Sequence, residues 1–282
     1  MFGGKMATDF EQLFLSQAKK KKRKIGIGIL RPIKETVDSL KKASEYADLT
    51  VVGANVPGFK CYPIKDPDKA SQKLISLLKN GEVEGIVRGQ VKDSYTLDEF
   101  HRQFNREPLP SNRKVAISVM KKGNYTFVPA TLSVYQGLKL EDKIYEVERI
   151  IKYIKEVLGL EPKIAVMGVL RPSSHRGQYK MLDDVTEQCA KFNEYLVKKG
   201  YDSKEYYMEY ETAVWEGRNL IVASTGFVGN SWIKALLYLG DWKLLGCAYL
   251  DLGVIYEDGT RNEKDYFYHI VHAVAMANKD LK

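Results

Sequence analysis

Cysteine, histidine and long apolar runs are all scarce in this 282-residue sequence, and each shortage excludes a class of protein. The three cysteines, Cys61, Cys189 and Cys247, are an odd number and form no CxxC pair, which argues against a disulfide scaffold and a zinc knuckle. The histidines show no spacing typical of a metal site, so we expect no metal ion. The sequence has no run of about 18 uncharged apolar residues and no apolar N-terminal stretch with a cleavage site. We therefore expect a cytoplasmic protein without a membrane partner.

Positive charge is in excess, with a formal net charge of +8, but six positive charges lie in the single cluster Lys19–Lys24. Such runs are usually solvated, and this one lies between a predicted helix and a predicted strand without interleaved aromatic residues. We expect no nucleic-acid partner and leave the role of the cluster open. The remaining positive balance suits a small anionic substrate.

Apolar runs and amphipathic segments alternate over the first 90 residues. The pattern predicts strands at 24–30, 48–54 and 83–89, separated by helices at 32–47 and 68–81. Short connections between alternating strands and helices predict a mainly parallel sheet with helices on both faces.

A polar segment with two prolines, residues 105–113, is typical of a crossing between domains. Beyond it the same kinds of pattern return. They predict strands at 114–120, 125–134, 163–170 and 219–224, with helices at 140–160 and 181–200. The overall prediction is an α/β protein.

Four of the turns that follow predicted strands carry polar residues, and ligands of parallel sheets bind at such carboxyl ends. Arg31 and Arg88 each follow a strand, although a surface salt bridge explains either one nearly as well. The turn after the strand 163–170 is denser. It contains Arg171, Ser173, Ser174, His175 and Arg176. Two guanidinium groups with hydroxyl groups favour phosphate or carboxylate binding over a solvated loop.

The fourth turn, Ser224–Asn230, leaves a predicted strand through Gly226, Gly229 and Asn230. The glycines would let the backbone approach a ligand closely or adopt a positive φ. Asn230 would either cap the following helix or hydrogen-bond a ligand. A tight turn with a capping asparagine explains the same residues, so both interpretations stay open.

Three motifs resemble the phosphate acetyl/butyryl transferase superfamily, which includes the PlsX-like phosphate acyltransferases. That superfamily carries Gly-Asn followed by a lysine after a second-domain strand, similar to Gly229, Asn230 and Lys234. Residues 158–174 resemble its Glu-Pro strand and serine-rich loop. Its Asn-Asp-x-Ser-Arg-Gly segment is similar to residues 257–262, where threonine replaces the serine and asparagine replaces the glycine.

The resemblance implies an isopropylmalate dehydrogenase-like architecture of two α/β/α domains with a cleft between them, in a homodimer. Residues 1–112 and 246–282 would form a first, discontinuous domain, and residues 113–245 the second. It also implies that Asp258, Thr260 and Arg261 are catalytic. The residues expected to bind phosphate or substrate are Arg31, Arg88, Arg171, Ser173, Ser174, Arg176, Gly226, Gly229 and Asn230.

Our main hypothesis is a transferase that binds phosphate, or an acyl phosphate and a thiol similar to coenzyme A or coenzyme M, without a tightly bound cofactor. Arg261 and Arg171 would clamp the anion, and Asp258 would act as base or orient Arg261.

The most similar branch is the methanogenesis marker protein 4 (MtxX) family of archaea, named as a methyltransferase subunit. It implies an alternative function in methyl transfer, with a methyltransferase or corrinoid protein as partner. A dehydrogenase ranks last, because Asp183 and Asp184 are its only candidate metal ligands and stand where a helix dipole explains them.

Overall fold

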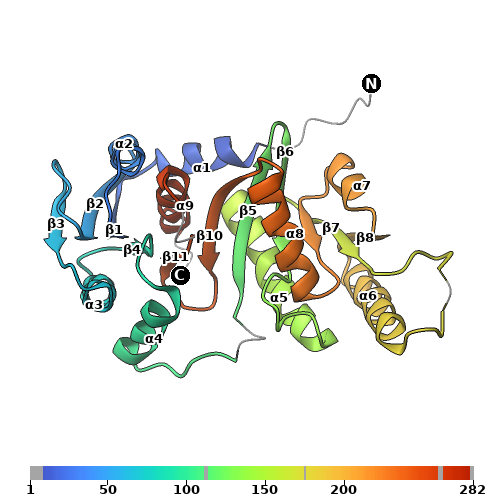
Figure 1. Ribbon diagram of the computed structural model, residues 1–282. Coiled ribbons are helices and arrows are strands. Elements are labelled where there is room, and N and C mark those ends of the chain that lie inside the picture. The colour runs from blue at the N-terminus through green and yellow to red at the C-terminus, as the bar shows by residue number, and fades with distance from the viewer. Residues whose placement is uncertain (1–8, 111–113, 175, 260–262, 280–282) are drawn as a thin grey trace. The chain divides into compact units, whose positions relative to one another are not determined.

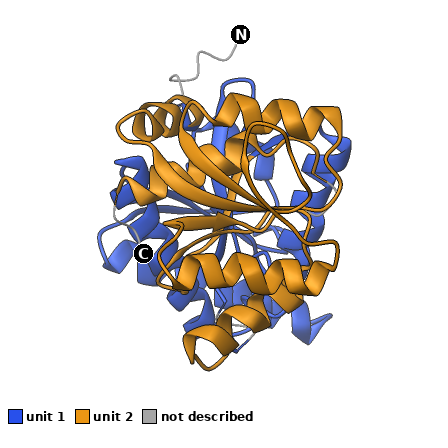
Figure 2. Ribbon diagram, turned by 90° about the vertical axis from the view of Figure 1, so that its left-hand side faces the viewer, with its two compact units in different colours: residues 1–10, 110–244 blue, residues 11–109, 245–282 orange. Residues whose placement is uncertain are grey.

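The computed structural model describes residues 9–110, 114–174, 176–259 and 263–279. The chain divides into two compact units, coloured separately in Figure 2. Unit 1 comprises residues 1–10 and 110–244, and unit 2 comprises residues 11–109 and 245–282. Each unit has a mainly parallel sheet with helices packed on it, which confirms the predicted α/β class. Among the described residues, none of the helices combines the length and the apolar character needed to cross a bilayer.

Unit 2 contains a sheet with the strand order β3-β2-β1-β4-β11-β10 (Figure 1). All neighbouring strands are parallel except β10 and β11, which are antiparallel. The strands are β1 (Arg23–Ile29), β2 (Ala47–Gly53), β3 (Lys60–Pro63), β4 (Gly85–Val87), β10 (Lys243–Tyr249) and β11 (Ile255–Glu257). The helices are α1 (Phe10–Ala18), α2 (Lys34–Ala43), α3 (Pro67–Lys79), α4 (Asp93–Phe104) and α9 (Phe267–Ala277).

Local sequence accounts for these elements. The helix α3 begins where the side chain of Asp66 accepts hydrogen bonds from the backbone N–H groups of Asp68 and Lys69, and Pro67 occupies the first turn. The helix α9 contains no Lys, Arg, Asp or Glu and is buried along nearly its whole length, against β1, β4 and β11. It is therefore the central helix of unit 2.

Unit 1 contains the strand order β5-β6-β9-β7-β8, in which β5 and β6 form an antiparallel hairpin and the other neighbours are parallel. The strands are β5 (Ala116–Lys122), β6 (Tyr125–Ala130), β7 (Lys163–Met167), β8 (Asp202–Tyr207) and β9 (Leu220–Val222). The helices are α5 (Leu140–Tyr153), which continues as a π-helical turn at Ile154–Leu158, α6 (Lys180–Lys198), α7 (Tyr210–Trp215) and α8 (Gly226–Leu239).

The strand order places one topological switch point in each sheet. In unit 2 the chain runs from β1 to β2 on one side and returns as β4 on the other, so the switch lies between β1 and β4. In unit 1 the same reversal occurs between β7 and β9. Ligands of open α/β sheets bind beyond the carboxyl ends of the strands at such points. Each switch point is bordered by two of the four turns singled out in the sequence.

Candidate functional site

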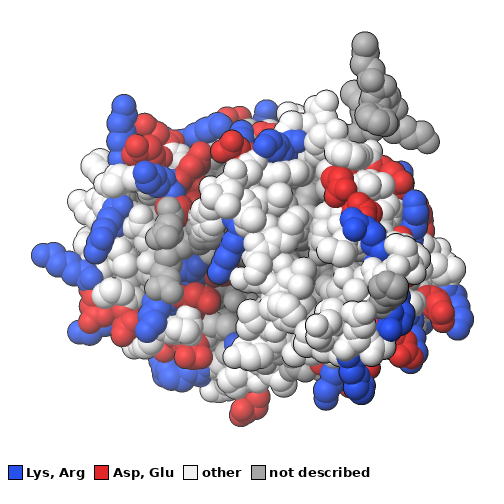
Figure 3. All heavy atoms as spheres, turned by 45° about the vertical axis from the view of Figure 1, so that its right-hand side comes forward, with Lys and Arg blue, Asp and Glu red and all other residues white. Residues whose placement is uncertain are grey.

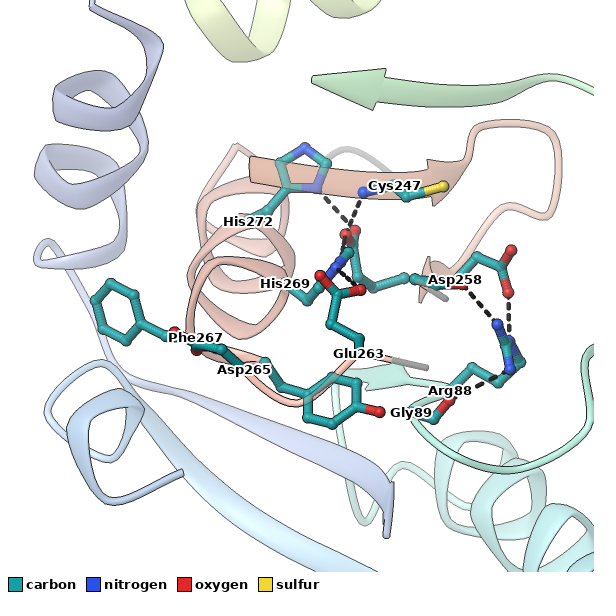
Figure 4. A network of polar contacts seen from close by, with 12 residues as sticks. Arg88, Gly89, Cys247, Asp258, Glu263, Asp265, Phe267, His269 and His272 are labelled. Carbon is teal, nitrogen blue, oxygen red and sulfur yellow. Dashed lines mark hydrogen bonds and ion pairs between the residues drawn. The ribbon is translucent and has the colours of Figure 1, made fainter. Parts of the chain in front are cut away.

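A buried ion pair lies at the carboxyl ends of β4 and β11 in unit 2 (Figure 4). These strands pair in parallel with Val87 opposite Glu257, so the next residues, Arg88 and Asp258, leave neighbouring strands together. The guanidinium of Arg88, which is 3% exposed, donates from Nε to Oδ1 of Asp258 at 2.5 Å. Burial raises the pKa of Asp258 to about 6, even though Arg88 acts to lower it. At neutral pH this carboxylate is ionised and close to the range of an effective general base.

The other donors of Arg88 are directed at backbone carbonyl groups. Its Nη1 donates to Val91 and Gly89, at 2.6 and 3.3 Å, and its Nη2 donates to Gly259 at 2.6 Å. The sequence analysis gave a surface salt bridge as the alternative role of Arg88. The salt bridge is present, but it is buried, and it joins the loop after β4 to the loop after β11. A direct contact between Arg88 and a ligand stays a prediction.

Glu257, one residue before Asp258, is fully buried and accepts three hydrogen bonds. Nδ1 of His269 and Nδ1 of His272 each lie 2.7 Å from its carboxylate, and the backbone N–H of Cys247 donates to it as well. Burial raises the pKa of Glu257, but the two histidines outweigh it and lower the pKa to about 2. Glu257 is thus a buried anion that is stabilised by hydrogen bonds to the ring nitrogens of His269 and His272.

His269 contacts two carboxylates, because its Nε2 lies 2.8 Å from Glu263 while its Nδ1 is bonded to Glu257. Burial lowers the pKa of His269, but these hydrogen bonds outweigh burial and raise the pKa to about 10. Both ring nitrogens act as donors, so His269 is an imidazolium at neutral pH. Figure 4 labels His269 and its neighbour Glu263.

Two buried tyrosines lie near enough to Asp258 to sense its charge. The rings of Tyr249 and Tyr256 pack edge to face with centroids 5.5 Å apart, and burial raises the pKa of both phenols. Among the described residues, the hydroxyl of Tyr256 and Oδ1 of Asp93 are buried without a hydrogen-bond partner. Unpartnered buried polar atoms of this kind are candidates for contact with a ligand or a bound water.

Gln90 bridges the switch point of unit 2. Its side-chain oxygen accepts from the backbone N–H groups of Leu30 and Arg31, at 2.8 and 2.7 Å, so the loop after β4 is tied to the loop after β1. The side chain of Arg31 is exposed, and within the described parts of the chain its guanidinium has no ion pair. Anion binding by Arg31 stays a prediction.

The predicted loop of unit 1 follows β7, and its arginines contact carboxylates. Nε of Arg171 donates to Glu209 at 2.7 Å, and Arg176 lies 3.9 Å from Asp183. Oγ of Ser174 accepts from the backbone N–H of Arg171, whereas Ser173 is exposed. Asp183 also accepts from the backbone of this loop, which gives it a structural role without a metal. His175, Thr260 and Arg261 lie outside the described residues.

The segment Ser224–Asn230 has a packing explanation. The helix α8 begins at Gly226, so Asn230 lies in its second turn and is not the cap. A Cβ placed on Gly226 would lie 1.6 Å from the carbonyl oxygen of Ser133, and one on Gly229 would lie 2.1 Å from that of Thr131. Nδ2 of Asn230 donates at 3.0 Å to the carbonyl oxygen of Leu132. Neither glycine has a positive φ, so both serve the close approach of α8 to the loop after β6.

Two buried charges that the sequence analysis missed hold the strand ends beneath this turn. Glu146 of α5 accepts from the backbone N–H and Oγ1 of Thr131, at 2.6 and 3.1 Å, and Thr131 has a strained φ of 65°. Lys143, one turn earlier, donates to the carbonyl oxygen of Ser224 at 2.8 Å. Both side chains are almost completely buried. The anion holds the end of β6, and the cation holds the end of the neighbouring β9.

The same place contains hydroxyl groups that have no partner. Oγ of Ser224 and Oγ1 of Thr225 are buried and have no hydrogen-bond partner among the described residues. Nζ of Lys143 lies 3.6 Å from Sγ of Cys189, and burial raises the pKa of that thiol. The described residues contain no group of three or more His, Cys, Asp or Glu side chains arranged to hold a metal ion.

Comparison with known proteins supports the fold. No protein-family model matches the chain. EutD phosphotransacetylase from Staphylococcus aureus is 14% identical, with a TM-score of 0.65 over 95% of this chain and 98% of that one. A branched-chain phosphotransacylase from Enterococcus faecalis V583 is 17% identical, with a TM-score of 0.61 over 92% of this chain and 100% of that one.

A 4-hydroxythreonine-4-phosphate dehydrogenase from Klebsiella pneumoniae is also similar. It is 14% identical, with a TM-score of 0.53 over 92% of this chain and 100% of that one. At such identities the likeness establishes a shared fold, which is the fold of the phosphotransacetylases. Proteins with different activities in their names share it, so function has to be argued from the site.

Proposed function

We propose that this protein is a transferase of the phosphate acyltransferase type, which moves an acyl group between phosphate and a thiol. The observation that carries the proposal is Asp258, a carboxylate with a pKa near 6 that Arg88 holds at the carboxyl end of β11. Thr260 and Arg261 stand two and three residues after it in the sequence. The phosphotransacetylase fold and the residues at the unit 2 switch point support the same reaction.

In the proposed reaction Asp258 accepts the proton of the attacking thiol. The thiolate sulfur attacks the carbonyl carbon of the acyl phosphate, and a C–S bond forms. The tetrahedral oxyanion then collapses, the C–O bond to phosphate breaks, and phosphate leaves with the electron pair. Arg261 and Arg31 would bind the phosphoryl oxygens, and the hydroxyl of Thr260 would donate to the oxyanion. Arg88 would orient Asp258.

The test is a spectrophotometric assay of acyl transfer from acetyl and branched acyl phosphates to coenzyme A or coenzyme M, joined to calorimetry with inorganic phosphate. Arg261→Ala should lower kcat by about 100-fold and weaken phosphate binding. Arg102→Ala is the matched control, because Arg102 is 68% exposed and pairs with a neighbour on its own helix. Unchanged phosphate affinity in Arg261→Ala would remove the assignment.

A second candidate is the methyl-transfer function of the methanogenesis marker protein 4 branch, in which the chain keeps the fold and acts with a methyltransferase or corrinoid protein. The exposed apolar surface of unit 1 favours a protein partner. Co-purification of a corrinoid protein from a methanogen, together with no turnover of any acyl phosphate, would favour this function over acyl transfer.

We also infer a homodimer in which α8 contacts a second copy of the chain. Its only charged residue is Lys234, and Phe227, Tyr238 and Leu239 are 50%, 62% and 85% exposed. Figure 3 shows a broad area without Lys, Arg, Asp or Glu side chains on one face of the molecule. Apolar surface of this kind is typical of an interface. Leu239→Glu should shift the mass measured by light scattering from dimer to monomer, and an unchanged mass would exclude α8 from the interface.

A further inference from the structure

We propose that His269 is a positioning residue that fixes the chain on both sides of Asp258. The proposal rests on the proposed function, because it assigns to a buried histidine the placement of the general base. His269 would act without contacting the substrate, through the residues before and after Asp258.

The contacts of His269 bracket Asp258. Its Nδ1 lies 2.7 Å from the carboxylate of Glu257, the residue before Asp258. A Cβ placed on Gly259, the residue after Asp258, would lie 3.3 Å from Cε1 of His269, so the ring packs against that glycine. Its Nε2 reaches Glu263 at 2.8 Å, where the chain enters α9. One ring therefore touches the chain before Asp258, after it, and again at Glu263.

The helix α9 gives His269 a fixed position. The side chain of Asp265 accepts from the backbone N–H of Phe267 at 2.8 Å and so orders the start of the helix. His269 is in the first turn, 1% exposed, on a helix that packs against β4 and β11. A ring on a buried helix has few rotamers available, and its two hydrogen bonds select one of them.

Electrostatics explains why a charged ring is needed. Glu257 is fully buried, and a buried carboxylate that loses its cation is strongly penalised. His269 supplies a cation shared between Glu257 and Glu263, while Arg88 supplies the cation for Asp258 and binds the carbonyl of Gly259. Two buried cations thus hold consecutive residues at the end of β11, His269 from α9 and Arg88 from the end of β4.

His272 offers a matched control. It lies one turn further along α9, is fully buried, and its Nδ1 contacts the other oxygen of Glu257 at 2.7 Å. His272→Gln therefore removes a buried ring from the same helix and the same carboxylate. His269→Gln removes, in addition, the packing on Gly259 and the bond to Glu263.

The experiment compares His269→Gln, His272→Gln and Glu263→Gln with the wild type in two assays. The first is kcat and KM for acyl transfer to the thiol. The second is amide hydrogen exchange at Asp258, whose backbone N–H donates to the carbonyl oxygen of Cys247. His269→Gln should lower kcat by about 10- to 100-fold with little change in KM, because a small misplacement of the base is sufficient for such a loss. It should also speed exchange at Asp258 at least tenfold.

Glu263→Gln keeps the proposal testable if the histidine variant does not fold, since Glu263 is 20% exposed. It should lower kcat in the same direction as His269→Gln, whereas His272→Gln should keep kcat within about twofold. Equal losses in the His269 and His272 variants, or unchanged kcat and exchange in Glu263→Gln, would overturn the positioning role. If the wild type turns over no acyl phosphate, the proposed function fails, while exchange at Asp258 still decides the role of His269.

Discussion

Unit 1 and unit 2 have the same class of architecture, but they differ in what they bury and what they expose. Unit 2 buries a network of charges around Glu257, Asp258 and His269. Among the described residues, every large apolar side chain that is exposed lies in unit 1 except Ile33. Unit 1 also buries the charged side chains of Lys143 and Glu146, but these bind the ends of β6 and β9. The comparison indicates a division of roles, in which unit 2 positions the reactive groups and unit 1 supplies apolar contact surface.

The difference originates in two helices: α9, which follows Asp258 in unit 2, and α8, which follows β9 in unit 1. The helix α9 is enclosed, and nearly all of its residues are buried. In α8 only Gly226, Gly229 and Ile233 are fully buried, and one side of this apolar helix, with Phe227, Tyr238 and Leu239, is exposed. A fully enclosed helix can hold charged groups because it excludes water, whereas a half-buried apolar helix is suited to a partner.

The largest expected effect follows from breaking the charge network of unit 2. Arg88→Met leaves Asp258 buried without its cation and the carbonyl of Gly259 without its donor. Unfolding in urea should show a loss of about 3–5 kcal/mol, the usual cost of removing one partner of a buried pair. Lys191→Met, at the exposed pair that Lys191 forms with Glu187 on α6, is the control and should change stability little. A similar loss in both variants would mean that burial of Arg88 does not matter.

The second prediction concerns pH, and it tests whether the network of unit 2 is charged. The pKa of His269 is raised from 6.5 to about 10, so above pH 6.5 the folded chain keeps a proton that the unfolded chain loses. Its contribution to stability is full below pH 6.5 and is lost as the pH rises to about 10. The pKa of Glu257 is lowered from 4.5 to about 2, so its contribution is present above pH 4.5 and is lost as the pH falls towards 2.

Urea unfolding at pH 6, 8 and 9.5 measures the alkaline part of this dependence. The wild type should lose stability steadily over that range, and His269→Gln should show a much flatter dependence. Parallel curves for the two proteins would show that His269 is neutral in the folded state.

The smallest expected effect is a change in the stability of unit 1 when Gly229 of α8 is replaced by alanine. Glycine to alanine in an ordinary helix interior stabilises by roughly 1 kcal/mol. At Gly229 the sign should reverse to a loss of about 1–3 kcal/mol, because the new Cβ would lie 2.1 Å from the carbonyl oxygen of Thr131. Ser231→Ala, at an exposed position of the same helix, is the control. A stabilised Gly229→Ala would show that α8 can move away from the loop after β6.

Periodicity and turn chemistry predicted the α/β class and the turns at the carboxyl ends of β1, β4, β7 and β9. They missed α4, which occupies the polar stretch after Gln90, because its apolar face is short of aliphatic residues. They also missed β10 and β11, which include the residues before Asp258. The strand β11 contains the buried Glu257, so it lacks the continuous apolar run by which β4 and β9 were recognised.

The partners of the site residues could not be predicted, because they come from distant parts of the chain. Arg88 and Asp258 are 170 positions apart, and no local pattern distinguishes this pair from a surface salt bridge. A signal for the histidines was present. His269 and His272 stand three residues apart on an otherwise apolar segment, which places both on one buried face and requires a buried acceptor.

The two segments of unit 2 are separated in the sequence by nearly all of unit 1. During synthesis, β4 therefore leaves the ribosome long before β11, the neighbour with which it pairs. Until that strand arrives, Arg88 has no counter-ion and the edge of β4 is open. Unit 1 can complete its fold in the meantime, while the sheet of unit 2 is still incomplete. Chaperones that protect unpaired strand edges would therefore act on unit 2.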